Sequence, residues 1–198
     1  MAEFSTKALK LILDHEGMNQ PENWPGGQSG ITIGIGYDLG YVTVDQFESD
    51  WGGVLTKSTR ARLAAVVGLR ALKAKNRAAS FAGVRLKRAD AELVFKNKTI
   101  PQFTLRAAQA FPGFYQLALD VEGAVVSLVY NRGTSMVDDS PEDRRKEMRA
   151  IRDAVAAGDL RKIAQQLRAM KRLWVGKGLD GLIERREAEA KLVESAVT

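Results

Sequence analysis

The chain has 198 residues, of which 45% are hydrophobic and 27% are charged, and its formal net charge at pH 7 is +6. This length suits one domain, or two lobes that share a core, and the apolar content is sufficient for a packed interior. The absence of cysteine excludes disulfides and thiolate metal sites, and a single histidine, His15, excludes multi-histidine metal sites and disfavours a Ser-His-Asp triad. We expect no metal site and no cofactor.

The start of the chain has no hallmark of a secretory signal. Lys7, Lys10 and Asp14 interrupt the apolar stretch of residues 1–16. No apolar run approaches the roughly 18 residues of a membrane span. We therefore expect synthesis in a host cytoplasm without a signal peptide, and no membrane span.

Charge is distributed unevenly along the chain. Residues 1–56 contain 2 basic and 8 acidic side chains, whereas residues 57–106 contain 13 basic and 2 acidic ones. A segment this basic indicates a polyanionic partner, either nucleic acid or an anionic surface such as a cell wall. The alternative is an ordinary solvated face.

The first predicted helix ends in a carboxylate. Ser5 or Thr6 can cap a helix that runs to about His15, and Gly17 follows it. Glu16 falls at the end of the apolar stripe formed by Leu9, Ile12 and Leu13. Partial desolvation there favours the protonated form that a general acid needs. His15 itself fits a residue at a helix end better than a catalytic base.

A loop and a small β element follow. Residues 18–30 are rich in Pro, Gly and Asn, and the alternation in 31–35 predicts a strand, with 41–44 as its partner across a turn at 38–40. Thr32 and Asp38 thereby come close in sequence to Glu16. Each is unremarkable alone, because Thr is common in strands and Asp in turns. Together they supply an acid, a second carboxylate and a hydroxyl, as glycoside hydrolysis requires.

Beyond residue 44 the periodicity is helical, which makes the fold mainly α with one small β element near the N-terminus. The most apolar segment, 121–130, predicts a helix through the core that ends at Gly133. The predicted helices are 45–51, 58–75, 86–97, 103–110, 121–130, 141–157, 158–170 and 178–193. We expect Pro101 to separate two of them and Pro141 to open another.

Several side chains are candidates for substrate contact. Glycines such as Gly36 let a sugar chain approach the strand backbone, or they simply form a tight hairpin. Trp24 and Trp51 are candidate sugar-stacking platforms, whereas Trp174 fits the core. Asn131 ends the apolar helix and can present an amide to a ligand, although a simple helix cap is the alternative.

Three segments, in order, resemble a known family. Glu16-Gly17, a loop, and Ile31-Thr32-Ile33-Gly34-Ile35-Gly36 resemble the active-site signature of the T-even-type phage lysozymes, glycoside hydrolase family 24. Residues 127–133 resemble its buried helix ending in Asn-x-Gly, and residues 174–189 resemble its closing helix with Arg-Arg-x-x-Glu.

The second carboxylate departs from the T-even pattern. Residues 17–31 contain no Asp, and Glu22 is the only acid there. The Gly-Tyr-Asp-Leu-Gly ending instead resembles a bacteriocin-like branch exemplified by pesticin, in which the Asp after the strand joins Glu and Thr. The resemblance thus implies the catalytic set Glu16, Thr32 and Asp38, with Glu22 as a fallback, and Tyr37, Gly36, Asn131 and Trp24 as substrate-binding residues.

The resemblance implies one lysozyme-like α+β domain over 1–198. A β-containing lobe at about 17–53 would pack against a helical lobe that includes helix 5–16, with the cleft between them. The implied enzyme is a monomeric, bacteriolytic hydrolase that cleaves the β-1,4 bond between N-acetylmuramic acid and N-acetylglucosamine in peptidoglycan. Its mechanism would be inverting, and segment 57–106 would hold the anionic wall.

Rival functions remain at the level of sequence. A lytic transglycosylase would cut the same bond with one Glu, and a basic wall-binding or nucleic-acid-binding protein would not cut it. Nucleic-acid binding is disfavoured, because the aromatic residues of 57–106 are few: Phe81, Phe95 and Phe103. A holin-released endolysin, a virion lysozyme and a bacteriocin domain all fit, each acting on the wall from the periplasm or from outside.

Overall fold

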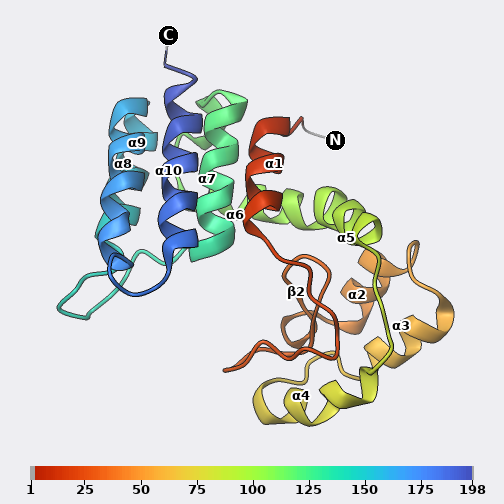
Figure 1. Ribbon diagram of the computed structural model, residues 1–198. Coiled ribbons are helices and arrows are strands. Elements are labelled where there is room, and N and C mark those ends of the chain that lie inside the picture. The colour runs from red at the N-terminus through yellow and green to blue at the C-terminus, as the bar shows by residue number, and fades with distance from the viewer. Residues whose placement is uncertain (1–2, 198) are drawn as a thin grey trace. The chain divides into compact units, whose positions relative to one another are not determined.

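The computed structural model describes residues 3–197, which are mainly helical with one two-stranded antiparallel sheet (Figure 1). Contacts divide the chain into two compact units. We call residues 16–100 the hairpin unit, and residues 1–15 with 101–198 the helical unit. The predicted α+β class, mainly α, is confirmed. The predicted β-containing lobe of about 17–53 falls inside the hairpin unit, and the assignment of 1–198 to a single domain stays a prediction.

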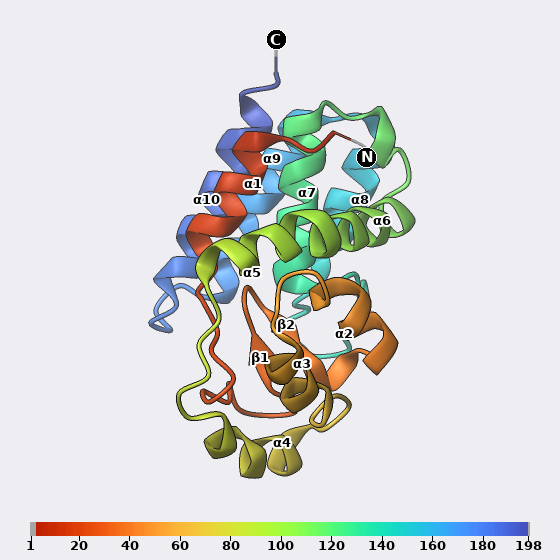
Figure 2. The same ribbon diagram turned by 90° about the vertical axis from the view of Figure 1, so that its right-hand side faces the viewer.

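The helical unit is built around α7 (Leu119–Arg132), which packs against α1 (Thr6–His15) and α10 (Asp180–Glu194) (Figures 1 and 2). The remaining elements are α6 (Ile100–Ala110), η4 (Phe114–Gln116), α8 (Lys146–Ala157), α9 (Leu160–Ala169) and η5 (Met170–Leu173). The predicted central helix is thus confirmed, because α7 is buried along nearly its whole length.

Glycines set the approach and the end of α7. A Cβ on Gly123 would lie 2.1 Å from the Cβ of Ala8, so α1 and α7 meet at two small residues. Gly133 has φ +69°, a conformation that lets the chain leave the helix where the sequence predicts.

In the hairpin unit, β1 (Thr32–Ile33) pairs with β2 (Tyr37–Asp38), not with residues 41–44 as predicted. The chain reverses early, because Gly34 and Gly36 have φ of +58° and +61° and so form a tight turn before Tyr37. Residues 39–41 form a short 3₁₀ turn, η1 (Leu39–Tyr41), in place of the predicted reversal.

The helices of the hairpin unit are α2 (Val44–Trp51), α3 (Lys57–Ala64), α4 (Ala71–Ala78), η2 (Ala79–Phe81), α5 (Arg88–Val94) and η3 (Phe95–Thr99). The prediction of a single helix over 58–75 is wrong. After α3 the chain forms a turn that includes Gly68 at φ +79°, and α4 begins only beyond this turn.

Two predicted effects of proline are also wrong. No break occurs near Pro101, because α5, the π-helical η3 and α6 follow one another without interruption. The wider π turn, with Ile100 N–H bonded to Phe95 O, accommodates a residue that cannot donate its own hydrogen bond. Pro141 opens no helix, since α8 begins at Lys146 after a turn in which Asp143 has φ +42°. Among residues 3–197, no helix combines the length and apolarity needed to cross a bilayer.

Candidate active site

Thr32 and Asp38 are direct partners across the hairpin. The register pairs Thr32 with Asp38 and Ile33 with Tyr37. Opposed residues of an antiparallel pair put their side chains on the same face, with Cβ atoms roughly 4.5–5.5 Å apart. The hydroxyl and carboxylate that the sequence places six residues apart therefore lie side by side, although residues between them form the turn.

Backbone N–H groups hold the Asp38 carboxylate in place. Its Oδ1 accepts from Gly30 N at 2.9 Å and from Gly40 N at 2.8 Å, whereas Oδ2 accepts a longer bond of 3.2 Å from Gly30. Oδ1 is thus the oxygen held more closely by the backbone, and the Ser29 side chain adds a further hydrogen bond to the carboxylate.

Burial raises the pKa of the Asp38 carboxyl above its usual range, and the bonds from Gly40, Gly30 and the Ser29 side chain oppose this rise. The nearby Arg70 guanidinium acts in the same lowering direction. A half-buried carboxylate that is oriented by neutral donors suits a general base.

Two glycines are required by the Asp38 anchor. A Cβ on Gly30 would lie 2.3 Å from Gly40 N and 2.5 Å from Asp38 Oδ1, and a Cβ on Gly40 would lie 2.9 Å from Gly30 Cα. The two backbone segments therefore approach too closely for any side chain at either position.

Glu16 is the first residue after α1, and it is half-buried. Three residues later Asn19 forms an isolated bridge with Gly34, with N···O distances of 2.7 and 2.9 Å in the two directions. The chain that leaves Glu16 is thus bonded to the turn of the hairpin that bears Thr32 and Asp38. His15 lies in the last turn of α1, as predicted, and its Nδ1 lies 2.9 Å from Leu11 O.

Tyr37 points into the core of the hairpin unit. Its hydroxyl donates to Asp50 Oδ2 at 2.8 Å, and its ring packs edge-on against Trp51. Burial, followed by this hydrogen bond, raises the pKa of the Tyr37 phenol. Its hydroxyl is therefore committed to Asp50. Trp51 is 1% exposed, so the expectation that it is a sugar platform is wrong, whereas Trp174 at 3% is a core residue as expected.

The turn glycines serve different purposes. A Cβ on Gly34 would meet the Trp51 ring at 2.7 Å, so this glycine is demanded by packing inside the protein. Gly36 is exposed, and its N–H donates to Asn19 Oδ1 at 3.2 Å. Only Gly36 of the pair presents its backbone to solvent.

The structure also gives the surroundings of three other candidate residues, each within its own unit. Trp24 is half-buried, donates to Ser29 O at 2.9 Å and lies 5.9 Å from Lys75 Nζ. Glu22 pairs with Arg85 at 2.8 Å. Asn131 lies near the end of α7 in the helical unit, where its buried Oδ1 has no hydrogen-bond partner among the described residues.

The sequence reasoning missed the polar core of the helical unit. Glu189 Oε1 accepts from Ser127 Oγ at 2.6 Å and from Arg186 Nη2 at 2.7 Å, and Arg185 Nε lies 3.4 Å away. All four side chains are buried. The Arg-Arg-x-x-Glu spacing is the signal, because residues three and four apart share one face of a helix.

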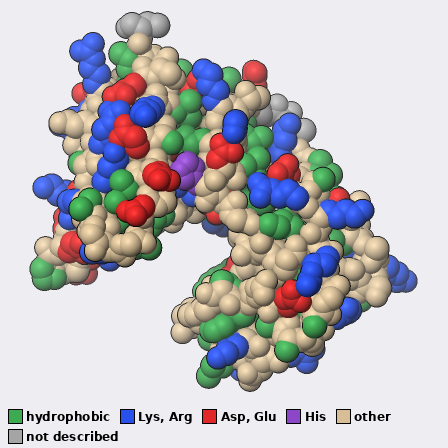
Figure 3. Space-filling view, viewed as in Figure 1, with side chains coloured by type: hydrophobic (Ala, Val, Ile, Leu, Met, Phe, Trp, Pro, Cys, Tyr) green, Lys and Arg blue, Asp and Glu red, His purple; other side chains and the backbone are tan. Residues whose placement is uncertain are grey.

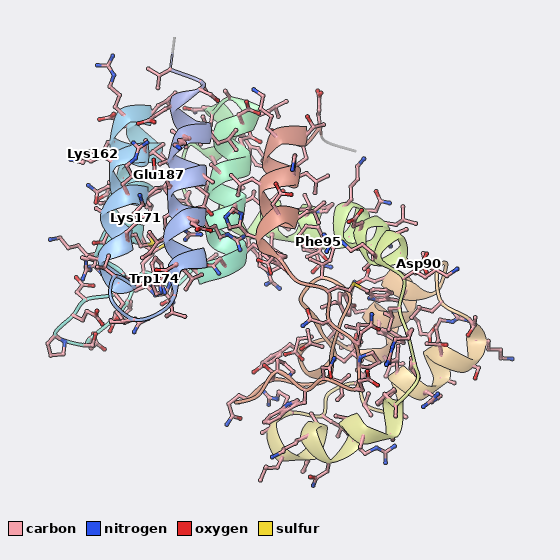
Figure 4. The ribbon with its side chains drawn as sticks, viewed as in Figure 1. Asp90, Phe95, Lys162, Lys171, Trp174 and Glu187 are labelled. Carbon is pink, nitrogen blue, oxygen red and sulfur yellow. The ribbon has the colours of Figure 1, made fainter. Side chains whose placement is uncertain are left out.

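Trp174 lies beside this cluster, within 5.9 Å of the Arg186 guanidinium and 5.3 Å of that of Arg132. Outside it, Glu187 contacts Lys171 and Arg168 at the surface (Figure 4). Interleaved acidic and basic side chains are visible along this side of the helical unit in Figure 3.

The described residues include no group of three or more acidic or histidine side chains that could hold a metal.

Comparison with known proteins gives one family. No curated protein matches the sequence. The profile of the Phage lysozyme family matches residues 15–189, which include Glu16, the hairpin, α7 and the buried Arg-Arg-x-x-Glu cluster. With most of its length matched, the chain belongs to the phage lysozyme family, whose members are lytic enzymes of peptidoglycan.

Proposed function

We propose that the protein is a muramidase that hydrolyses the β-1,4 bond between N-acetylmuramic acid and N-acetylglucosamine, with Glu16, Thr32 and Asp38 as its catalytic set. The observation that carries the proposal is the Thr32–Asp38 register on a hairpin whose turn is bonded to the segment following Glu16. We propose that the chain follows the pesticin-like arrangement of the family rather than the T-even one, with the second carboxylate after the strand.

In the proposed reaction, Glu16 protonates the leaving glycosidic oxygen as the general acid. Asp38 takes a proton from a water through Oδ2, while Oδ1 stays anchored to Gly30 and Gly40. Thr32 orients the same water through its hydroxyl. Attack by this water on the face opposite the leaving group inverts the anomeric configuration.

Asp38 is favoured over Glu22 as the second carboxylate. Glu22 is held by Arg85, so removing a proton from water would compete with an existing ion pair. Among residues 3–197, the hydrogen-bond donors to Asp38 are neutral: the backbone N–H groups of Gly30 and Gly40 and the Ser29 side chain.

For substrate contact we retain Gly36, through its exposed backbone, together with Trp24 and Asn131. We leave out Tyr37, because its hydroxyl is bonded to Asp50. The proposed site of action is the bacterial wall, reached from the periplasm or from outside the cell. The proposed working form is a monomer.

We further propose that the basic segment 57–106 holds the anionic wall. Part of its charge is balanced inside the hairpin unit, where Arg60, Arg85 and Arg88 pair with Glu48, Glu22 and Glu92. The unbalanced remainder would bind the wall electrostatically, so binding to intact walls should weaken as salt is added.

Digestion of purified peptidoglycan, followed by mass spectrometry of the products, tests the function. A muramidase releases fragments with hydrated, reducing muramic acid ends. Anhydro-muramic ends would support the transglycosylase instead, and no cleavage at all would leave only a binding protein.

A further inference from the structure

One arginine of the hairpin unit is fixed beside Asp38 and forms no ion pair with any of the described residues. Arg70 immediately precedes α4, and the backbone on both sides of it is bonded to the hairpin ends. Gly68 N donates to Leu39 O at 2.9 Å, and Ala71 N donates to Ser29 O at 3.0 Å. In Figures 1 and 2, α4 accordingly lies next to the loop that leads into β1.

The backbone at this point is strained. Ala71 has φ +51°, in the left-handed region that a residue with a Cβ seldom adopts. Strain of this kind persists only where surrounding contacts impose it, and it is concentrated at functional sites. Here the imposing contacts are the bonds that fix Arg70 over the hairpin.

The Arg70 side chain is exposed to solvent and is held in place by packing against Gly40 and Tyr41. Its Cγ packs over Gly40, where a Cβ would come within 2.7 Å of it, and its guanidinium stacks on the Tyr41 ring at 5.1 Å. Tyr41 is 60% exposed and is itself held by a bond from its hydroxyl to Gln28 O at 3.1 Å. Arg70 is exposed, and its guanidinium forms no hydrogen bond with any residue in 3–197.

Several other arginines of the hairpin unit have a partner, unlike Arg70. Arg60 and Arg85 form ion pairs, and Arg62 donates to Ser80 O at 2.6 Å. A guanidinium that is pre-positioned by stacking, with its donors unused, is suited to bidentate binding of a planar carboxylate.

We propose that Arg70, on its Tyr41 platform, is a substrate-binding residue that takes a carboxylate of the peptide stems of peptidoglycan. This inference rests on the proposed function, because peptide stems are attached to the muramic acid next to the bond that is cut. Because Arg70 lies near Asp38, it would contact the part of the peptidoglycan strand that is bound at Asp38. Its task is to select stem-bearing glycan over bare glycan.

Binding measured without cleavage tests the proposal. In a Glu16→Gln background, calorimetric titration compares soluble glycan strands that bear peptide stems with the same strands stripped by an amidase, both free of phosphate polymers. We expect Arg70→Gln to weaken binding of stem-bearing strands about tenfold and to leave binding of stripped strands unchanged. Arg70→Lys, which keeps the charge but loses the planar fork, should give an intermediate loss.

Arg161→Gln is the matched control, because Arg161 is an exposed arginine on α9, outside the basic segment 57–106. It should leave both affinities unchanged, and thermal unfolding should report the same midpoint for all variants. Equal weakening on both polymers, or no weakening on either, would overturn the proposal. Failure of the wild type to cleave peptidoglycan would count against the proposed function alone, since stem-dependent binding is measured independently.

Discussion

The two units of the molecule handle buried charge in opposite ways. In the helical unit, Glu189 lies between two fully buried arginines and a serine, all on regular helices. In the hairpin unit, Asp38 is half-buried and is held by backbone N–H groups of two glycines. A charge balanced by other charges stabilises a scaffold, whereas a charge held by neutral donors keeps its reactivity.

Irregular backbone borders the hairpin on several sides, although the helical unit also contains left-handed residues, among them Asp143 at φ +42°. Left-handed turns at Gly34 and Gly36, the close pair Gly30 and Gly40, and the strained Ala71 all surround the hairpin. The helical unit presents one long buried helix, α7, and helices packed on it. We therefore expect substitutions in the hairpin unit to change activity first, and those in the helical unit to change stability first.

The largest effect is expected for Glu16→Gln. Loss of a general acid lowers rates by about 10²–10⁴-fold, and we expect kcat to fall by about a thousandfold with no change in the unfolding midpoint. Release of reducing ends from peptidoglycan measures it. Glu184→Gln, an exposed position on α10, should retain full activity. Appreciable hydrolysis by Glu16→Gln would remove Glu16 from the mechanism.

Next is Glu189→Ala in the helical unit. It leaves Arg185 and Arg186 buried without their shared carboxylate, which costs about 3–5 kcal/mol of unfolding free energy. Urea denaturation measures the loss. Activity per folded molecule should be retained, and a selective loss of activity at unchanged stability would contradict the division between the units.

Asp38→Asn should lower kcat by about a hundredfold, because the amide cannot accept a proton from water. The pH profile carries a second signature. A general base must be ionised, so kcat/KM falls as pH drops through its pKa. Since burial raises the Asp38 pKa, this acid limb should lie above the range of an ordinary aspartate. Its presence unchanged in Asp38→Asn would assign the limb to another group.

Tyr37→Phe distinguishes a core tyrosine from a sugar-binding one. The variant removes the donor to Asp50, whose side chain is 1% exposed, and should cost about 1–2 kcal/mol of unfolding free energy. Gln46, which also donates to Asp50 at 2.8 Å, limits the loss. A raised KM with unchanged stability would instead return Tyr37 to the substrate site.

The smallest effect is expected for Glu187→Gln, two residues from Glu189 but at the surface. Hydrogen bonds from Arg168 and then Lys171 lower the pKa of Glu187 to about 2. Because the folded pKa lies below the unfolded one, the stabilisation is present at neutral pH and is lost as pH falls toward about 2. Solvent screening limits it to under about 1 kcal/mol, and added salt should reduce it further.

Local signals in the sequence predicted most of the fold. The apolar period located α1 and α7, and Gly133 marks a helix end as expected. The errors arose where tertiary contacts overrode local rules. Pro101 is absorbed by a π turn, and early pairing of β2 depends on Gly34 fitting against Trp51.

The candidate site was predictable only in part. Glu16, Thr32 and Asp38 could be selected from residue type and order. The pairing of Thr32 with Asp38 depends on a strand register, which strands of two residues are too short to indicate in the sequence. The anchoring of Asp38 requires Gly30 and Gly40 to meet, and the partner of Tyr37 lies 13 residues away. Such contacts are formed by the folded backbone rather than by any spacing in the sequence.

The most direct test of the account is the anomeric configuration of the first product. Proton NMR of a fresh digest of a soluble glycan follows the new reducing end before mutarotation. If Asp38 activates water opposite the bond that Glu16 protonates, the α-anomer appears first. First appearance of the β-anomer would contradict the proposed roles of the two carboxylates.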